Sequence, residues 1–258
     1  MKASLIAYGL GLAWAILAHG ALAAGDGTAV AVDPDAQAQA GSATRILAMG
    51  SDISVGELVV TGPRGQVQIV FNDQTRLVVG PGSSLKIEAY LMANGNTAQK
   101  LAINALGGSF RFITGNSPKP AYSIRTPNAA IAVRGTKFDI IVGANETAVM
   151  LYEGALQICA TGGDCKDVTN RCEVGTASSQ RALVFPWASA DHQSLSVQFR
   201  YARFQKPLLP DFRVTGTARC AEEKSGDDPT SLSTTSGDGV VPKTPPQVTG
   251  NGPRPTVP

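Results

Sequence analysis

Between residues 44 and 178 the chain repeats one pattern, in which apolar residues occupy every second position and short turns rich in Gly, Asn and Asp interrupt them. Successive side chains of a β-strand point to opposite faces, so this period predicts strands with one buried face. No amphipathic helix pattern separates the strands, which argues against parallel βαβ units. We therefore expect an all-β domain, a β-sandwich or β-roll of about a dozen short strands. The clearest runs lie at 66–71, 85–89, 110–112, 138–142 and 149–158.

Composition supports this fold and excludes several classes of function. Apolar residues make up 43% of the chain, enough for a core, and the 28 glycines suit many turns. The whole chain has two histidines and four cysteines, which argues against histidine catalysis and histidine-rich metal sites. A formal net charge of +2 argues against nucleic acid as a partner, because nucleic-acid binding needs a concentrated basic surface. We expect no enzymatic activity, no metal and no cofactor.

The N-terminus has the pattern of a secretory signal peptide. Lys2 precedes an apolar run over residues 5–22, and Ala21-Leu22-Ala23 provides a small-x-small cleavage site. A retained membrane anchor needs about 20 apolar residues, but this run contains three glycines and His19, and no basic residues follow it. We expect residues 1–23 to be removed, which leaves no retained transmembrane helix. The product would be exported to the periplasm of a Gram-negative bacterium, or secreted.

The rest of the chain divides by composition. Residues 24–43 are small and polar and are expected to form an extended lead-in to the β-domain at 44–178. Residues 179–221 would form a C-terminal extension packed on that domain. The segment 222–258 contains seven prolines and no aromatic residue, so it cannot bury enough surface to fold and is expected to be a disordered tail.

The extension contains one helix signal. Ser189 is a suitable N-cap, and three apolar residues follow at helical spacing on one face: Leu195, Phe199 and Ala202. Alternation through Val197 leaves a strand as the other possibility. His192 lies at the start of this helix, where a capping or surface role is expected.

The four cysteines suit an oxidising compartment and two disulfides, and four cysteines allow three pairings. Alternation in the strand before Cys159 places its side chain on the outer face, and a turn at 161–164 brings Cys165 back opposite it. We favour Cys159–Cys165 with Cys172–Cys220. A four-thiolate zinc site is the rival interpretation, but the spacing contains no CxxC pair.

The most distinctive stretch is Ser123-Ile-Arg-Thr-Pro-Asn-Ala-Ala-Ile-Ala-Val-Arg-Gly-Thr-Lys-Phe138. It resembles the FecR domain, which occurs in periplasmic signalling proteins and in stand-alone exported proteins. In that family a TP-x-A segment leads into VRGT-x-F, and an EG turn follows. The matching residues here are Thr126-Pro127, Val133-Arg134-Gly135-Thr136, Phe138 and Glu153-Gly154.

Upstream segments continue the resemblance, which covers about residues 44–178. The family patterns G-x-x-I-x-TG, F-x-DGS, L-x-x-x-S and G-x-F-R-F are similar to residues 56–62, 71–75, 77–84 and 108–112. Gln74 departs from the family, which usually has the glycine of DGS at this position. The sequence alone therefore does not determine the exact geometry of this turn.

The physical roles expected for the central motif are mainly structural. Because Pro127 fixes φ and lacks an N–H, Thr126-Pro127 should lie at a strand start or edge. Gly135 is expected to form a bulge or a tight bend. The hydroxyl of Thr136 can close that turn.

The charged residues of the motif allow two interpretations. In the first, the planar guanidinium of Arg134 holds the turn by binding carbonyls or a carboxylate such as Asp139 or Glu153. In the second, Arg125, Arg134 and Lys137 together form an anion or partner site.

The resemblance implies a role in binding or signal relay. Membrane-bound family members pass a signal to a sigma factor through a cytoplasmic domain and an internal transmembrane helix, and this sequence contains neither. We therefore expect a non-catalytic cell-envelope binding or signal-relay module whose partner is an envelope protein. The alternative is an envelope scaffold or surface protein that binds cell-wall polysaccharide or partner proteins.

Overall fold

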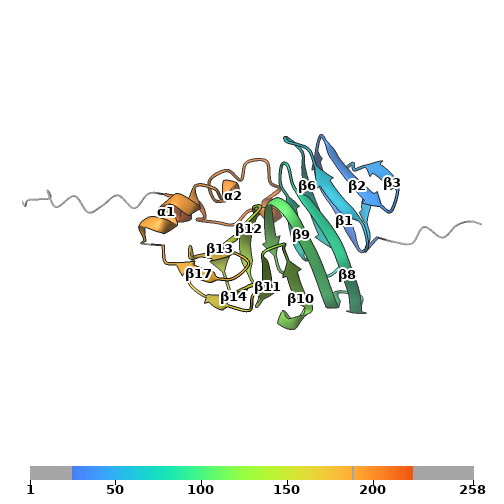
Figure 1. Cartoon of the computed structure of the whole chain (residues 1–258). Helices are drawn as coiled ribbons and strands as arrows, with labels where there is room; N and C mark the ends of the chain where they lie inside the picture. Colours follow the sequence, from blue (N-terminus) through green and yellow to red (C-terminus); the bar gives the residue numbers. More distant parts are fainter. Residues whose placement is uncertain (1–24, 188, 223–258) are drawn as a thin grey trace, which may run out of the picture. The chain divides into compact units, whose positions relative to one another are not determined.

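A computed structural model describes residues 25–187 and 189–222 (Figure 1). The expected signal peptide and nearly all of the expected tail lie outside these residues. The described part is dominated by strands, so the chain has the all-β fold that the alternation predicts. Within the described residues, no helix has the length and apolar character needed to cross a membrane.

The described residues form seventeen strands. Those before the longest strand are β1 (Gly27–Asp33), β2 (Ala36–Ala40), β3 (Ala43–Ile46), β4 (Asp52–Ile53), β5 (Leu58–Thr61), β6 (Gln66–Phe71), β7 (Arg76–Val79) and β8 (Ser84–Asn94). The others are β9 (Thr97–Ile113), β10 (Tyr122–Arg125), β11 (Ala129–Val133), β12 (Lys137–Val142), β13 (Thr147–Glu153), β14 (Leu156–Ala160), β15 (Cys165–Val168), β16 (Val174–Ala177) and β17 (Ala182–Phe185).

The strands are arranged in two sheets that share β9. One sheet, here called the covered sheet, has the order β4-β1-β6-β7-β9-β12-β13-β16-β17. The other, here called the open sheet, has the order β3-β2-β5-β8-β9-β10-β11-β14-β15. Strand β9 passes from the open sheet to the covered sheet at Gly107-Gly108, where Gly108 has a φ of 105°. This positive φ is one that glycine adopts without strain.

The main core fills the space between the sheets. It contains the inward-facing residues of both, including Phe71, Phe110, Phe112 and Phe138. Strands of the open sheet, such as β11, alternate between buried and exposed residues, so their outer face is in contact with solvent. Strands of the covered sheet, such as β13, are buried on both faces. The two sheets therefore differ in what lies on their outer faces.

The C-terminal extension covers the outer face of the covered sheet. It contains α1 (Ala190–Ser196), α2 (Arg200–Arg203) and 3-10 turns at 210–212 and 218–221. A further 3-10 turn, at 119–121, precedes β10 in the β-domain. Figure 1 places α1 and α2 on the side of the molecule where β12 and β13 lie. Two further apolar clusters form beneath the extension, one around Met150 and Phe199 and one around Val78 and Phe212.

The expected helix forms but ends early. The Ser189 hydroxyl accepts a hydrogen bond from the His192 N–H, as an N-cap does. The helical backbone stops after Ser196 and resumes at Arg200, which leaves Val197 exposed while Phe199 and Ala202 are buried. His192 was expected to have a capping or surface role, but its side chain is buried, with 1% exposure. Its Nε2 lies 2.6 Å from the Cys172 carbonyl oxygen.

Residues of the expected lead-in are part of the sandwich. β1 pairs with β6 in the covered sheet, and β2 pairs with β5 in the open sheet. Their inward residues are alanines, among them Ala29, Ala36 and Ala38, each at most 3% exposed. Small side chains carry a weak alternation signal, and for this reason the sequence suggested an extended segment and fewer strands.

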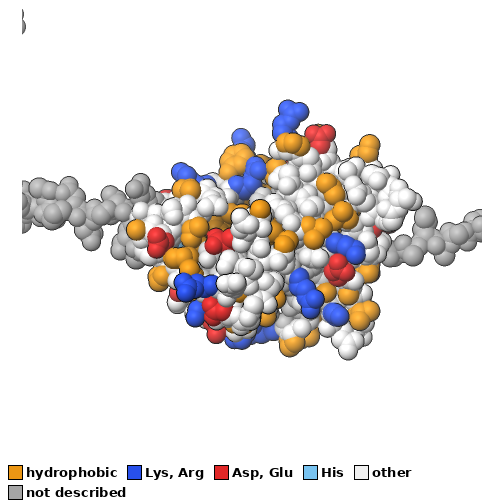
Figure 2. All heavy atoms as spheres, in the orientation of Figure 1, with side chains coloured by type: hydrophobic (Ala, Val, Ile, Leu, Met, Phe, Trp, Pro, Cys, Tyr) orange, Lys and Arg blue, Asp and Glu red, His pale blue; other side chains and the backbone are white. Residues whose placement is uncertain are grey.

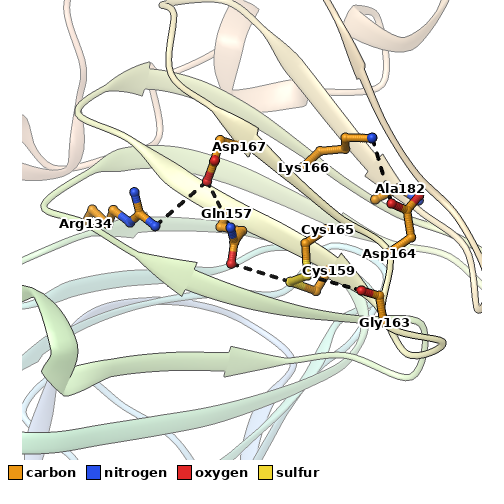
Figure 3. Close-up of a disulfide and its surroundings, with 9 residues drawn as sticks. All are labelled: Arg134, Gln157, Cys159, Gly163, Asp164, Cys165, Lys166, Asp167 and Ala182. Carbon is orange, nitrogen blue, oxygen red and sulfur yellow. Dashed lines mark hydrogen bonds and ion pairs between the residues drawn. A yellow bond between two sulfur atoms is a disulfide. The ribbon is translucent and has the colours of Figure 1, made fainter.

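Both cysteine pairs have the favoured connectivity, Cys159–Cys165 and Cys172–Cys220. Cys159 and Cys165 are directly opposite each other on β14 and β15 (Figure 3). Cys172 and Cys220 are buried and join the loop before β16 to the end of the extension. Because all four sulfurs are in disulfides, the zinc interpretation is wrong.

Candidate functional site

The VRGT and EG motifs form two neighbouring corners between the sheets. Residues 134–136 carry the chain from β11 in the open sheet to β12 in the covered sheet, and Gly154 begins the return from β13 to β14. The Arg134 N–H donates to the Ala155 carbonyl at 3.0 Å, so the corners are joined through their backbones. Gly154 has a φ of 85°, and a Cβ at this position would overlap the carbonyl oxygen of Gly135. Gly135 itself has a φ of 75° at a tight bend.

Arg134 does not hold its turn through Asp139 or Glu153, so this expectation is wrong. Its side chain is 56% exposed and its nearest carboxylate is Asp167 on β15, at 3.9 Å (Figure 3). Alternation directs Arg134 to the outer face of the open sheet, whereas Asp139 lies on the outer face of the covered sheet. Glu153 pairs instead with Lys137 at 2.7 Å.

The hydroxyl of Thr136 does not close the turn either. It is buried and has no hydrogen-bond partner among the described residues. The backbone of Thr136 makes the contacts instead, since its N–H donates to the Thr114 hydroxyl at 3.0 Å and its carbonyl accepts from the Thr114 N–H at 3.0 Å. A threonine hydroxyl does close a neighbouring turn, the one that contains Pro127. There the Thr126 hydroxyl accepts a hydrogen bond from the Ala129 N–H at 2.9 Å.

The candidate trio of Arg125, Arg134 and Lys137 is divided by the fold. Arg125 and Arg134 lie at opposite ends of the β10–β11 hairpin, because Arg125 pairs with Ala130 near the turn and Arg134 follows the last residue of β11. At about 3.3 Å per residue, their backbones are separated by roughly 13 Å. Lys137 is on β12 in the covered sheet and paired with Glu153. The three residues therefore do not form a single anion site.

A buried ion pair occupies the covered sheet instead. Arg111 is fully buried, and its Nε and Nη2 donate to the Asp139 carboxylate at 2.6 and 3.0 Å. The Tyr152 hydroxyl donates to the same carboxylate at 2.6 Å, and Arg111 Nη2 also donates to the Tyr201 carbonyl at 2.9 Å. Arg111 further contacts the Gln205 amide oxygen. This centre joins β9, β12 and β13 to the extension.

The electrostatics of this centre keep its charges fixed. Burial opposes the charge of Arg111, but the Asp139 carboxylate outweighs it and raises the pKa of Arg111. Burial, together with Asp139, raises the pKa of Tyr152 well above its usual value. Both groups therefore remain protonated as hydrogen-bond donors. The arrangement is typical of a structural ion pair, with every partner already occupied.

A second buried carboxylate fixes the turn between β6 and β7. Asp73 is fully buried and accepts from the hydroxyls of Thr75 at 2.8 Å, Ser117 at 2.5 Å, Tyr122 at 3.2 Å and Tyr90 at 3.3 Å. Burial and the nearby Asp73 charge raise the pKa of Tyr90, which keeps this phenol protonated. Asp73 therefore ties its turn to β8, β10 and the loop after β9.

The open sheet has a surface hollow of about 470 Å³ across β8, β9 and β10. Its polar lining comes from three neighbouring strands: Glu88, Lys100, Asn104, Ser123 and Arg125. Ala89 and Ala102 also line it, and their small side chains leave the space between the polar residues open. The pairing of β8 with β9 shifts register between Ile87 and Ala89, and such a bulge redirects side chains locally. We call this hollow the open-sheet groove.

The groove combines two unpaired cations with polar neutral groups. Within residues 25–187 and 189–222, Lys100 and Arg125 form no ion pair or hydrogen bond through their side chains. Glu88 pairs with Lys86 at 3.5 Å. The lining contains no aromatic ring on which a sugar could stack. Such a site is suited to an extended segment that carries carboxylates and hydrogen-bonding groups.

Only one of the groove residues, Arg125, was identified from the sequence. Glu88 lies on a clear predicted strand, Lys100 and Asn104 join it through the antiparallel pairing of β8 with β9, and Ser123 and Arg125 join it because β10 pairs in parallel with β9. The available signal was the outward position of these polar residues in the alternation. Within the described residues, His, Cys, Asp and Glu side chains form no group suited to a metal ion.

Comparison with known protein families tests the resemblance to FecR domains that these motifs indicate. Residues 57–157 match the model of the family described as FecR protein. The chain contains a FecR domain. Both corners, the Asp73 turn, Arg111 with Asp139, and the open-sheet groove lie within this FecR domain, whereas the C-terminal extension lies outside it.

Solved structures show a more distant similarity. Two crystal structures, at 1.65 and 2.50 Å, of a protein named as a candidate anti-sigma factor from Parabacteroides distasonis ATCC 8503 are 12% identical to this chain, with a TM-score of 0.40 for each. The aligned part covers 54% of this chain and 63% or 62% of the other, so this chain spans less than two thirds of that protein. No curated protein matches the chain.

Proposed function

We propose that this protein is a non-catalytic, exported binding module that relays a signal in the cell envelope, and that its open-sheet groove contacts a protein partner. The FecR domain at residues 57–157 is the observation that carries the proposal. The groove lies in that domain, on the outer face of the open sheet, which no other element of residues 25–187 and 189–222 covers. The unpaired charges of Lys100 and Arg125 favour a partner segment with acidic side chains.

Export is supported by two independent features. The N-terminal sequence has a charged start, an apolar run and a small-residue cleavage site. Two disulfides join the four cysteines, and such bonds persist in oxidising compartments. We assign the protein to the periplasm of a Gram-negative bacterium, or to the medium after secretion.

A non-catalytic role is supported by how the buried acids are used. Asp73 and Asp139 each accept several short hydrogen bonds from neighbouring side chains, and Asp139 is also neutralised by Arg111. Groups held in this way have no free lone pair directed at a substrate. Their chemistry stabilises the fold on which the groove is built.

Site-specific photo-crosslinking in cells tests the proposal. The full chain is expressed with its own N-terminus, and a photo-reactive residue replaces Ser123 in the groove or Ser194 on α1. We expect one discrete protein adduct from position 123 and none from position 194. Adducts are purified and identified by mass spectrometry.

A charge-reversal pair provides the matched control. The variant Lys100→Glu/Arg125→Glu should abolish the adduct, whereas Arg64→Glu/Arg181→Glu, which changes the net charge equally at exposed positions outside the groove, should retain it. Equal adducts in both variants would reject the groove as the contact. If the chain crosslinks to no protein but is retained on purified cell-wall polysaccharide, the scaffold alternative replaces signal relay.

A further inference from the structure

The C-terminal extension has an exposed surface in which basic and large apolar side chains are interleaved. Residues 197–213 contain four basic residues and a single acidic one, Asp211. The basic residues are all exposed: Arg200, Arg203, Lys206 and Arg213. Three large apolar side chains lie among them, Val197, Phe204 and Leu209, with 57%, 51% and 39% exposure. We call these residues the basic surface.

Packing of the same segment explains why these side chains point outward. Tyr201, Leu208 and Phe212 form one apolar cluster with Val78 of β7, and the Arg111 guanidinium donates to the Tyr201 carbonyl. These inward contacts fix the backbone over the covered sheet. Arg200, just before them, and the residues between them at 203, 204, 206 and 209 are therefore held toward solvent.

The positive charges are partly fixed in place. The Arg213 Nε and Nη2 donate to the carbonyls of Leu208 and Lys206 at 2.7 and 3.1 Å. The Arg200 guanidinium lies 5.5 Å from the centre of the Tyr201 ring. The Asp211 carboxylate lies 3.9 Å from the Arg76 guanidinium, measured from Oδ2 to Nη2, so the negative charge of Asp211 is offset by a residue outside the basic surface. The surface therefore keeps a positive excess, and Figure 2 shows Lys and Arg side chains beside hydrophobic ones over α2 and the segment after it.

We propose that the basic surface binds the anionic face of a lipid bilayer. Charge complementarity selects an anionic partner, since each Lys or Arg near an anionic bilayer increases partitioning about fivefold. The protruding Phe204, Leu209 and Val197 would enter the boundary between headgroups and acyl chains, as apolar residues of interfacial segments do.

This binding would also orient the FecR domain. The basic surface lies over the outer face of the covered sheet, and the open-sheet groove lies on the outer face of the other sheet. A molecule attached through the extension would therefore direct its groove away from the bilayer. The inference concerns a different surface from the proposed function and does not depend on it.

Vesicle sedimentation of the full chain from residue 24 tests this inference. We expect strong binding to vesicles of phosphatidylcholine mixed with phosphatidylglycerol, little binding to phosphatidylcholine alone, and weakening at high salt. The variant Arg200→Glu/Arg203→Glu/Lys206→Glu should lower the partition coefficient at least about a hundredfold. The matched control Lys86→Glu/Lys100→Glu/Arg125→Glu changes the net charge equally on the open sheet and should bind nearly as well as the parent.

Two outcomes would overturn the inference: no preference for phosphatidylglycerol, or equal losses in both charge-reversal variants. Circular dichroism and thermal unfolding confirm that each variant is folded. If the first variant does not fold, the milder Arg203→Gln/Lys206→Gln replaces it, with an expected loss of about 25-fold. Phe204→Ser supplies an independent readout, since it should reduce the salt-resistant part of the binding without changing the charge.

Discussion

Individual residues of this protein have roles set by which face of the sandwich they occupy. Arg111 lies between Phe110 and Phe112 on β9 and would be an ordinary outward-facing arginine if the covered sheet were exposed. The extension covers it, so the guanidinium is fully buried against Asp139. Arg134, in the most recognisable motif, remains solvated and paired loosely with Asp167. We therefore expect Arg134, the more conspicuous arginine in the sequence, to contribute less to stability than Arg111.

Replacing each arginine by methionine should separate these roles. Arg111→Met leaves the Asp139 carboxylate buried without its cation, so the free energy of unfolding should fall by about 3–5 kcal/mol. Arg134→Met removes only an exposed, long ion pair and should change stability by less than about 0.5 kcal/mol. Chemical denaturation of both variants measures this. Similar losses in the two would contradict the assignment.

Gln74 shows the cost of a departure from the family pattern. Its φ is 67°, in the left-handed region that favours glycine, at the position where FecR proteins usually have glycine. Gln74→Gly should relieve this strain and raise the free energy of unfolding by up to about 1 kcal/mol, the gain being limited by the greater freedom of glycine in the unfolded chain. Gln74→Ala keeps the Cβ and should have no such effect. Urea unfolding of both variants is the measurement, and equal stabilities would refute backbone strain as the cause.

His192 should make stability depend on pH. Burial lowers the pKa of His192 below 6.5, although the hydrogen bond with the Cys172 carbonyl opposes this shift. The folded protein thus prefers the neutral ring, and its contribution is complete above about pH 6.5 and lost as the pH falls through the folded value. Unfolding free energies measured from about pH 8 to about pH 5 should decline in the parent protein. The decline should be smaller in His192→Gln, and identical pH profiles would exclude this role.

At the scale of elements, the strands were predictable and their allocation to sheets was not. Alternation and turn residues identify β6, β8, β12 and β13, because both signals are local. The passage of β9 through both sheets and its parallel pairing with β10 join residues that are distant in sequence. The groove depends on that pairing, and for this reason the sequence identified only Arg125 among its lining residues.

The two glycine corners allow a test at this scale. Gly135→Ala places a Cβ near only the end of the Lys119 side chain and costs the strain of its positive φ, about 1–2 kcal/mol. Gly154→Ala adds a clash with the Gly135 carbonyl, so at least about 3 kcal/mol of stability should be lost. Thermal unfolding of both variants compares them. An equal loss would mean that the two corners do not pack against each other.

At the scale of the whole molecule, the extension and the FecR domain act as one folded unit. The Cys172–Cys220 bond, the Arg111 centre and the apolar clusters under α2 all join them. The other disulfide, Cys159–Cys165, connects adjacent strands at the edge of the open sheet (Figure 3). The two bonds therefore constrain very different lengths of chain.

Removing each disulfide should reflect this difference. Loop-closure entropy gives about 4 kcal/mol for the separation of 48 residues between Cys172 and Cys220, and about 2 kcal/mol for the separation of 6 between Cys159 and Cys165. Cys172→Ala/Cys220→Ala should thus be the less stable variant. It should also lose hydrogen-exchange protection in the extension before the sheets do. A larger loss in Cys159→Ala/Cys165→Ala would contradict this view of the molecule.

The sequence alone predicted the all-β class and the relationship to FecR domains, since period, turn residues and motif spacing are local properties of the chain. It favoured the observed disulfide pairing among three, but Cys172–Cys220 joins residues 48 apart, and the structure decided it. The sequence did not show that Asp139 binds Arg111, that Arg125 and Arg134 are far apart, or that residues 27–40 are strands of the sandwich. These features depend on which of the two sheets each strand joins and on what covers the outer face of that sheet. Only the tertiary structure decides that, because the extension buries one sheet and leaves the other open to solvent.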